Sequence, residues 1–241
     1  MLQQTQVKRV LDYWPRFLSL FPTIDALASA CTSDVLSQWQ GLGYNRRALA
    51  LKRCADICSA EHGGLLPDSV DELVKLPGIG PATAAGVVAF AFDRPALYLE
   101  TNVRTVFLHE LFPGQDGVKD AALNPLVEIS CPADHARDWY YALLDYGANL
   151  KATLPNPSRR SAHHTRQSAF EGSRRQKRAE LIRIVLAAGA EGIEASKAAF
   201  LLNETERKAG RDGASEEEIA SIIDDLAVEG FFKRTGSLLV S

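Results

Sequence analysis

The chain has 241 residues, of which 46% are apolar and 24% charged, and its formal net charge at pH 7 is −3. This composition is ordinary for a globular protein of one or two domains, and it excludes a uniformly basic protein that coats nucleic acid. Residues 151–178, however, hold eight lysines and arginines and one glutamate, a local charge of +7. The remainder has 19 basic and 29 acidic residues, a charge of −10. A strongly basic stretch therefore lies within an acidic chain.

The cysteines provide no recognisable metal site. They are Cys31, Cys54, Cys58 and Cys131, and no two of them form a C-x2-C pair. Their spacing therefore predicts neither zinc nor an iron–sulfur cluster, and scattered thiols are typical of a reducing compartment. The sequence has no apolar run of about 18 residues. It also has no basic segment followed by an apolar one at its start. We therefore expect no membrane span and no secretory signal, and predict a cytoplasmic protein.

The first 150 residues are predicted to be all helical. Apolar residues recur at three- and four-residue spacing, and no alternating strand pattern occurs before residue 230. The predicted helices cover residues 3–21, with a break at Pro15, and then 33–40, 45–61, 82–92, 102–112 and 134–150. A further short helix is predicted after Asp68, which can cap it. The helix over 82–92 is rich in alanine and glycine, which predicts a neighbour packed closely against it.

The last third of the chain differs in pattern. Residues 151–173 lose the helical period and are interpreted as an irregular basic connector, which leaves residues 1–150 as one domain and 174–241 as another. Helices are predicted over 174–187, 195–202 and 215–228, followed by a hairpin over 231–240. Three helices and a hairpin indicate a small winged-helix-like domain. Its third helix is acidic and would repel phosphates, so we expect a packing or partner role there.

The sharpest local motif is a glycine-rich turn. Residues 76–84 read LPGIGPATA, with two glycines immediately before a helix. Such a turn leaves backbone N–H groups exposed at a helix N-terminus, where they can bind one DNA phosphate. The alternative is a plain turn between two helices.

A second motif places a carboxylate at the start of a helix. Residues 98–104 read YLETNVR, so Glu100 lies at the entrance of the helix predicted to follow. The helix dipole favours a negative charge there. Taken alone, the motif is better explained by an ordinary capping acid.

Together these motifs resemble the helix-hairpin-helix DNA glycosylase superfamily, which includes endonuclease III and the MutY-type adenine glycosylases. The resemblance covers residues 1–150 and includes MLQQTQV at 1–7, GLGYNRRA at 41–48, LPGIG at 76–80 and LETNVR at 99–104. The first two motifs are MutY-like. The family implies an all-α, two-lobed protein that binds DNA in the cleft between its lobes.

The resemblance assigns the chemistry to Glu100. This residue stands where the family has its catalytic aspartate, near the sugar carbon C1′, and would stabilise an oxocarbenium-like transition state. It is one methylene longer, so the geometry differs from the family's. Ala82 stands where bifunctional members carry the lysine that attacks the sugar. The resemblance therefore implies a monofunctional enzyme that acts by hydrolysis.

The resemblance also implies a set of DNA-binding residues. Gln3 and Gln4 would probe the base stack, and Tyr44 would insert near the extruded base. The structural alternative for Tyr44 is a half-buried aromatic at a helix cap. The other predicted DNA-binding residues are Arg47, Leu76, Gly78, Ile79, Gly80, Thr83, Asn102 and Arg104.

The sequence departs from the family in three places. MutY-like enzymes have a glutamate just before the MLQQTQV motif that protonates adenine. This chain begins inside the motif, so we expect either a truncated start or loss of that acid. Most relatives bind a [4Fe–4S] cluster through cysteines that follow the segment matching residues 145–148, whereas this chain has the basic connector there and we expect no cofactor. Finally, residues 174–241 are too short and too helical for the domain with which MutY proteins recognise oxidised guanine.

Arg159 and Arg160 of the connector are predicted to replace the cluster loop in docking the DNA backbone, the alternative being a solvated linker. His163 and His164 have no nearby partner ligand in the sequence, so a metal site is not predicted. The sequence as a whole predicts a monomeric, monofunctional glycosylase acting on mismatched or damaged duplex DNA, with adenine as the excised base. The alternatives are a thymine or uracil mismatch glycosylase, and a non-catalytic DNA-binding protein of the same fold.

Overall fold

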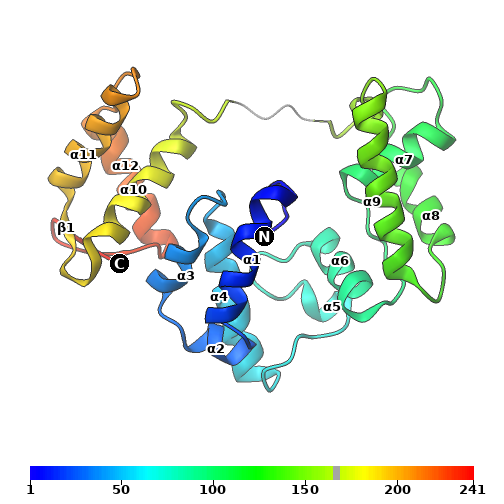
Figure 1. Ribbon diagram of the computed structural model, residues 1–241, viewed down its shortest axis with the longest axis horizontal. Helices are drawn as coiled ribbons and strands as arrows, with labels where there is room; N and C mark the ends of the chain where they lie inside the picture. Colours follow the sequence, from blue (N-terminus) through cyan, green and yellow to red (C-terminus); the bar gives the residue numbers. More distant parts are fainter. Residues whose placement is uncertain (165–168) are drawn as a thin grey trace. The chain divides into compact units, whose positions relative to one another are not determined.

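The computed structural model describes residues 1–164 and 169–241, and these are predominantly helical. The α-helices are α1 (Val7–Leu20), α2 (Ile24–Ser29), α3 (Thr32–Trp39), α4 (Arg46–Glu61), α5 (Val70–Leu73), α6 (Pro81–Phe92), α7 (Thr101–Leu111), α8 (Asp120–Ser130), α9 (Ala136–Thr153), α10 (Arg174–Ala188), α11 (Ala195–Lys208) and α12 (Glu216–Glu229). The short 3₁₀ helices are η1 (Pro157–Arg160) and η2 (Gly189–Glu191), and the strands are β1 (Ile193–Glu194), β2 (Lys233–Thr235) and β3 (Leu238–Val240) (Figure 1). The all-α prediction is confirmed.

The chain divides into two compact units. The first unit comprises Met1–Leu65 together with Ser168–Ser241, and the second comprises Leu66–Gln167. These bounds differ from the domain boundaries predicted at residues 150 and 174. The first unit is built from both ends of the chain. The boundary after Leu65 therefore divides the predicted N-terminal domain between the two units.

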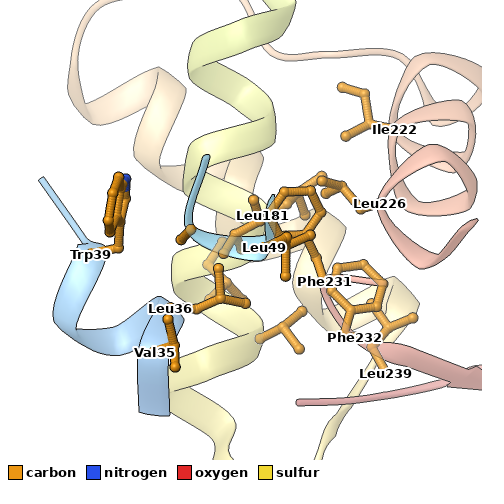
Figure 2. Close-up of a cluster of buried hydrophobic side chains, with 14 of the residues drawn as sticks. Val35, Leu36, Trp39, Leu49, Leu181, Ile222, Leu226, Phe231, Phe232 and Leu239 are labelled. Atoms are coloured by element: carbon orange, nitrogen blue, oxygen red, sulfur yellow. The ribbon is translucent and has the colours of Figure 1, made fainter. Parts of the chain in front are cut away.

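The core of the first unit is shared between distant parts of the sequence. Figure 2 shows Leu36 and Leu49, from α3 and α4, beside Leu181 of α10 and Phe231 near the hairpin. All of these side chains are buried. The apolar faces of the N-terminal helices are thus buried by the C-terminal domain, which provides the free energy that holds the two segments together.

The C-terminal domain has the predicted winged-helix order. Helix α10 is followed by β1, helices α11 and α12, and the hairpin β2–β3. The three antiparallel strands have the order β1-β3-β2, with Ile193 opposite Leu239. Strand β1 was not predicted, because two residues are too few to show an alternating pattern. Ser215 caps α12, accepting a hydrogen bond from the backbone N–H of Glu218 at 3.2 Å.

The second unit has its own core, formed mainly by α7, α8 and α9 around Leu108, Leu123 and Tyr140. Helix α8 was not predicted, and it contains Pro125. The close neighbour expected for the small-residue helix α6 is Tyr98. A Cβ atom at Gly86 would lie 2.9 Å from Cε2 of Tyr98, so only glycine fits beside this ring.

The structure corrects the predictions made for the starts of two helices and for the break at Pro15. The cap of α5 is Ser69, whose Oγ accepts from the backbone N–H of Glu72 at 3.3 Å, whereas Asp68 forms an ion pair with Arg94. Helix α1 begins at Val7 and continues through Pro15, so the first six residues precede it. Within residues 1–164 and 169–241, no helix is both long and apolar enough to span a membrane.

Candidate functional site

Glu100 is the N-cap of α7. Its Oε1 accepts hydrogen bonds from the backbone N–H groups of Asn102 and Val103, the latter at 3.1 Å. The side chain is only half-buried. These bonds satisfy two of the free N–H groups of the first helical turn and fix the carboxylate at the positive end of the helix dipole. The capping role and a chemical role are therefore compatible.

The extended segment that leads to Glu100 is held by two tyrosines. The backbone N–H of Tyr98 donates to Oη of Tyr140 at 3.2 Å, and Tyr140 in turn donates to the carbonyl of Ala96. The rings of Tyr98 and Tyr140 meet edge to face at 5.4 Å. Burial, with a smaller effect of Glu100, raises the pKa of Tyr98 to about 12, and burial also raises the pKa of Tyr140. Both hydroxyls consequently stay protonated at neutral pH.

Gly147 is a positioning residue that the sequence did not reveal. It lies within α9, and a Cβ atom there would clash with the backbone carbonyl of Asn102 and lie 2.9 Å from its Cα. Helix α9 thus packs directly against the first turn of α7, next to Glu100. A glycine inside an otherwise regular helix is the signal that could have indicated this contact.

The glycine-rich turn precedes α6 as predicted. Gly78 has φ of +74°, which favours glycine, whereas Gly80 is the N-cap of α6 with φ of −87°. A Cβ atom at Gly80 would have no heavy atom within 4 Å. The protein's own packing therefore does not require glycine at position 80, but a bare backbone there leaves the helix N-terminus open to an anion. Leu76 is buried in the core, and Ile79 and Thr83 are half-buried.

Arg47 joins two loops of the first unit. Its guanidinium donates to the carbonyls of Met1, at 2.8 Å, and Gln3, and to those of Leu42, at 3.2 Å, and Gly43, at 3.0 Å. Burial lowers the pKa of this group. The side chain predicted to bind DNA instead ties the loop around Gln3 to the loop before Tyr44.

These two loops carry unusual backbone conformations. Gln4 has φ of +57° and Tyr44 has φ of +49°, two of the four positive-φ residues other than glycine in the described part of the chain. Bulky residues rarely adopt this region, and such strain is concentrated at functional sites. Gln4 is exposed and Tyr44 half-exposed. The first unit therefore brings Gln3, Gln4 and Tyr44 together on loops fixed by Arg47.

Two other predicted DNA-binding arginines have partners within the protein. Arg104 forms a bidentate ion pair with Asp120, and both nitrogen–oxygen distances are 2.8 Å. Hydrogen bonding from Arg104 lowers the pKa of Asp120. Arg160 donates to the carbonyls of Leu108, at 2.8 Å, and Phe112, at 2.7 Å, at the end of α7. Both guanidinium groups are thus engaged in holding α7.

Three further cations of the basic stretch form ion pairs with α12. Arg174 pairs with Asp225 at 2.7 Å, Lys177 with Glu218 at 2.8 Å, and Arg178 with Glu229 at 2.7 Å. Arg166 lies outside the described residues. Arg159, in contrast, is exposed, and none of the described residues forms an ion pair with it.

The cysteines do not fit an iron–sulfur cluster. Cys54 and Cys58 are buried in α4 of the first unit, whereas Cys131 belongs to the second unit. The segment after α9 contains η1 and no cysteine. Among the residues that the structure describes, no three histidine, cysteine, aspartate or glutamate side chains are grouped as metal ligands.

Comparisons with known proteins agree with this arrangement. Residues 1–239 match the family described as HhH-GPD superfamily base excision DNA repair protein. The chain is 32% identical to an adenine DNA glycosylase of Mycobacterium tuberculosis, over 98% of this chain and 83% of that protein. It is 35% identical to an adenine DNA glycosylase of Buchnera aphidicola, over 61% of this chain and 42% of that protein.

The solved structures support the fold. A thermostable thymine-DNA glycosylase has a TM-score of 0.53 at 24% identity, covering 61% of this chain and 69% of that one. An endonuclease III in a non-covalent DNA complex has a TM-score of 0.53 at 22% identity, covering 63% of this chain and 72% of that one. With the family match over nearly the whole sequence, the chain belongs to the HhH-GPD superfamily of base excision DNA repair proteins.

Proposed function

We propose that this protein is an adenine DNA glycosylase that acts as a monomer on mismatched duplex DNA. The observation that carries the proposal is the 32% identity to an adenine DNA glycosylase over 98% of this chain. The organisation of Gln4 and Tyr44 on strained loops supports it, because these loops contain the MutY-like motifs.

In the proposed reaction, Glu100 acts on the sugar of the extruded nucleotide. The bond between C1′ and adenine N9 breaks with its electron pair leaving on the base, which takes up a proton. The carboxylate, fixed by the backbone of α7, stabilises the positive charge that develops at C1′ and orients water. The water oxygen bonds to C1′ and loses a proton, giving an abasic site and free adenine.

The same proposal predicts that the protein has no lyase activity. Ala82 is exposed in the first turn of α6, at the place of the lysine in bifunctional members. Without an amine there, no Schiff base with the sugar forms, and borohydride should trap no protein–DNA adduct. We also propose that the protein contains no iron–sulfur cluster, so the purified protein should contain no stoichiometric iron.

The test uses duplexes with A·G, A·8-oxoguanine, T·G and U·G pairs, incubated with the protein and then treated with alkali. We expect strand cleavage at adenine after alkali and none without it, and loss of cleavage in Glu100→Gln. Cleavage at thymine or uracil alone would establish the mismatch alternative. Binding without excision of any base would favour the non-catalytic alternative.

A further inference from the structure

The guanidinium of Arg175, in the C-terminal domain, lies over the ring of Tyr44. Arg175 is the second residue of α10, and its guanidinium carbon lies 5.6 Å from the centroid of the Tyr44 ring and 5.4 Å from that of Phe170. Both distances are within the range of cation–π attraction. The guanidinium therefore contacts one ring from the N-terminal part of the chain and one from the connector.

The anchoring of α10 makes this contact well defined. Arg178, one turn along α10 from Arg175, pairs with Glu229 at 2.7 Å, and Arg46 of α4 donates to the same carboxylate at 2.7 Å. Helices α4 and α10 also share the apolar core of the first unit. The backbone of Arg175 is thus held in place relative to the loop that ends at Tyr44.

Tyr44 needs such support because of its backbone. With φ of +49°, it occupies a region that persists only where the surroundings enforce it. Arg47 fixes the preceding carbonyls of Leu42 and Gly43, and its guanidinium lies 5.6 Å from the Tyr44 ring centroid. Arg47 therefore holds the loop and also contacts the ring, whereas Arg175 contacts the ring from the C-terminal part of the chain.

We propose that Arg175 is a positioning residue that holds the Tyr44 ring for insertion beside the mismatched base. The C-terminal domain then contributes to mismatch recognition through one side chain and not through its acidic helix α12. This inference rests on the proposed function only in assigning the DNA contact to Tyr44. The contact between Arg175 and the ring is independent of it.

A double-mutant cycle on binding tests the inference. The dissociation constants for an A·G duplex and its matched counterpart are measured for wild type, Arg175→Ala, Tyr44→Leu and the double variant. We expect Arg175→Ala to weaken A·G binding about fivefold when Tyr44 is present, and to have almost no effect in the Tyr44→Leu background. Tyr44→Phe should keep the dependence on Arg175, since the ring remains. Equal losses in both backgrounds would overturn the proposal.

Two further variants separate positioning from charge. Arg175→Lys keeps the charge but loses the planar group that stacks on the rings, so it should weaken A·G binding, though less than alanine does, with an unchanged salt slope. A fall of about one in the slope for Arg175→Ala, with lysine behaving as wild type, would mean direct phosphate contact and would also overturn the proposal. Arg207→Ala, an exposed arginine of α11, is the matched control.

A readout without DNA completes the test. Ring currents should shift the Nε proton of Arg175 upfield in the NMR spectrum of the free protein, and Tyr44→Leu should reduce that shift. An unaffected shift would contradict the contact. A protein that binds mismatches without excising adenine would fail the proposed function and still give a coupling between Arg175 and Tyr44, so the two failures are distinguishable.

Discussion

Glu100 caps α7, and substitutions can separate this capping role from the chemical role that we propose for it. Its Oε1 accepts from two backbone N–H groups of α7, which fixes the longer side chain where the family has an aspartate. The length of the side chain is thus accommodated by local hydrogen bonding.

For Glu100→Gln we expect excision of adenine to slow by about a hundredfold or more, because the charge that stabilises the transition state is lost. The amide oxygen can still cap α7, so the melting temperature should change little. Glu100→Ala should lose the rate and about 1 kcal/mol of stability. Single-turnover excision and thermal unfolding measure the two effects. A Glu100→Gln enzyme with the wild-type rate would exclude a catalytic carboxylate at this position.

The two glycines of the hairpin should behave differently. Gly78→Ala should destabilise the protein by about 1 kcal/mol, because its φ of +74° is strained for alanine. Gly80→Ala has space and an ordinary φ, so stability should be unchanged, whereas DNA affinity should fall because the methyl group obstructs the phosphate site. Denaturant unfolding and DNA binding distinguish them. Unaltered binding by Gly80→Ala would contradict phosphate capture at this turn.

Arg159 and Arg160 form a matched pair for the backbone-docking prediction. Arg159→Ala removes an exposed charge, so the slope of log affinity against log salt should fall by about one, with no loss of stability. Arg160→Ala removes the hydrogen bonds to the end of α7 and should lower the melting temperature. An unchanged slope in Arg159→Ala would contradict docking of the DNA backbone by Arg159 and would favour the alternative of a solvated linker.

At the scale of elements, the start of α7 is positioned by α9. Gly147 allows the two helices to touch at the backbone of Asn102, two residues from Glu100. Gly147→Ala should therefore force the helices apart, at a cost of about 1–3 kcal/mol. It should also slow excision without weakening DNA binding to the same extent, because the carboxylate moves. Gly213→Ala, whose Cβ would lie 2.9 Å from Oδ1 of Asn203 in the first unit, is the control, because it is equally crowded but belongs to the other unit. Equal effects of both variants on the rate would remove the special role of Gly147.

At the scale of the whole molecule, three cations at the start of α10 form ion pairs with the acidic helix α12. Hydrogen bonds from Arg46 and from Arg174 are the main causes that lower the pKa values of Glu229 and Asp225, respectively. A carboxyl group with a lowered folded-state pKa contributes stability above its unfolded pKa and loses it as the pH falls through the folded value. The near-neutral total charge therefore conceals an electrostatic contact between α12 and both α4 and α10.

This contact predicts a pH dependence. Glu229→Gln should destabilise the first unit at pH 7, and the difference from wild type should disappear as the pH falls through the lowered folded-state pKa of Glu229, where the wild-type carboxylate becomes protonated. Urea unfolding followed by tryptophan fluorescence at several pH values measures this, since Trp39 is buried in the first unit. Asp224→Asn, on the exposed side of α12 and paired with Arg234, is the control. A difference that persists at low pH would show that Glu229 acts through packing and not through charge.

The sequence by itself determined the helical class, the hairpin glycines, the three helices and hairpin of the C-terminal segment, and Glu100 at the start of a helix. These features depend on residues within a few positions of one another, so periodicity and capping patterns reveal them. The two-residue strand β1 and the proline-containing helix α8 lack a clear period and were missed for that reason. Only the tertiary structure decided which arginines are available to DNA. The guanidinium groups of Arg47, Arg104 and Arg160 are hydrogen-bonded to oxygen atoms of the protein. Arg46 forms an ion pair with Glu229, which lies 183 residues away in the sequence. It likewise showed that both ends of the chain share one core, because such contacts depend on three-dimensional proximity that no local pattern encodes.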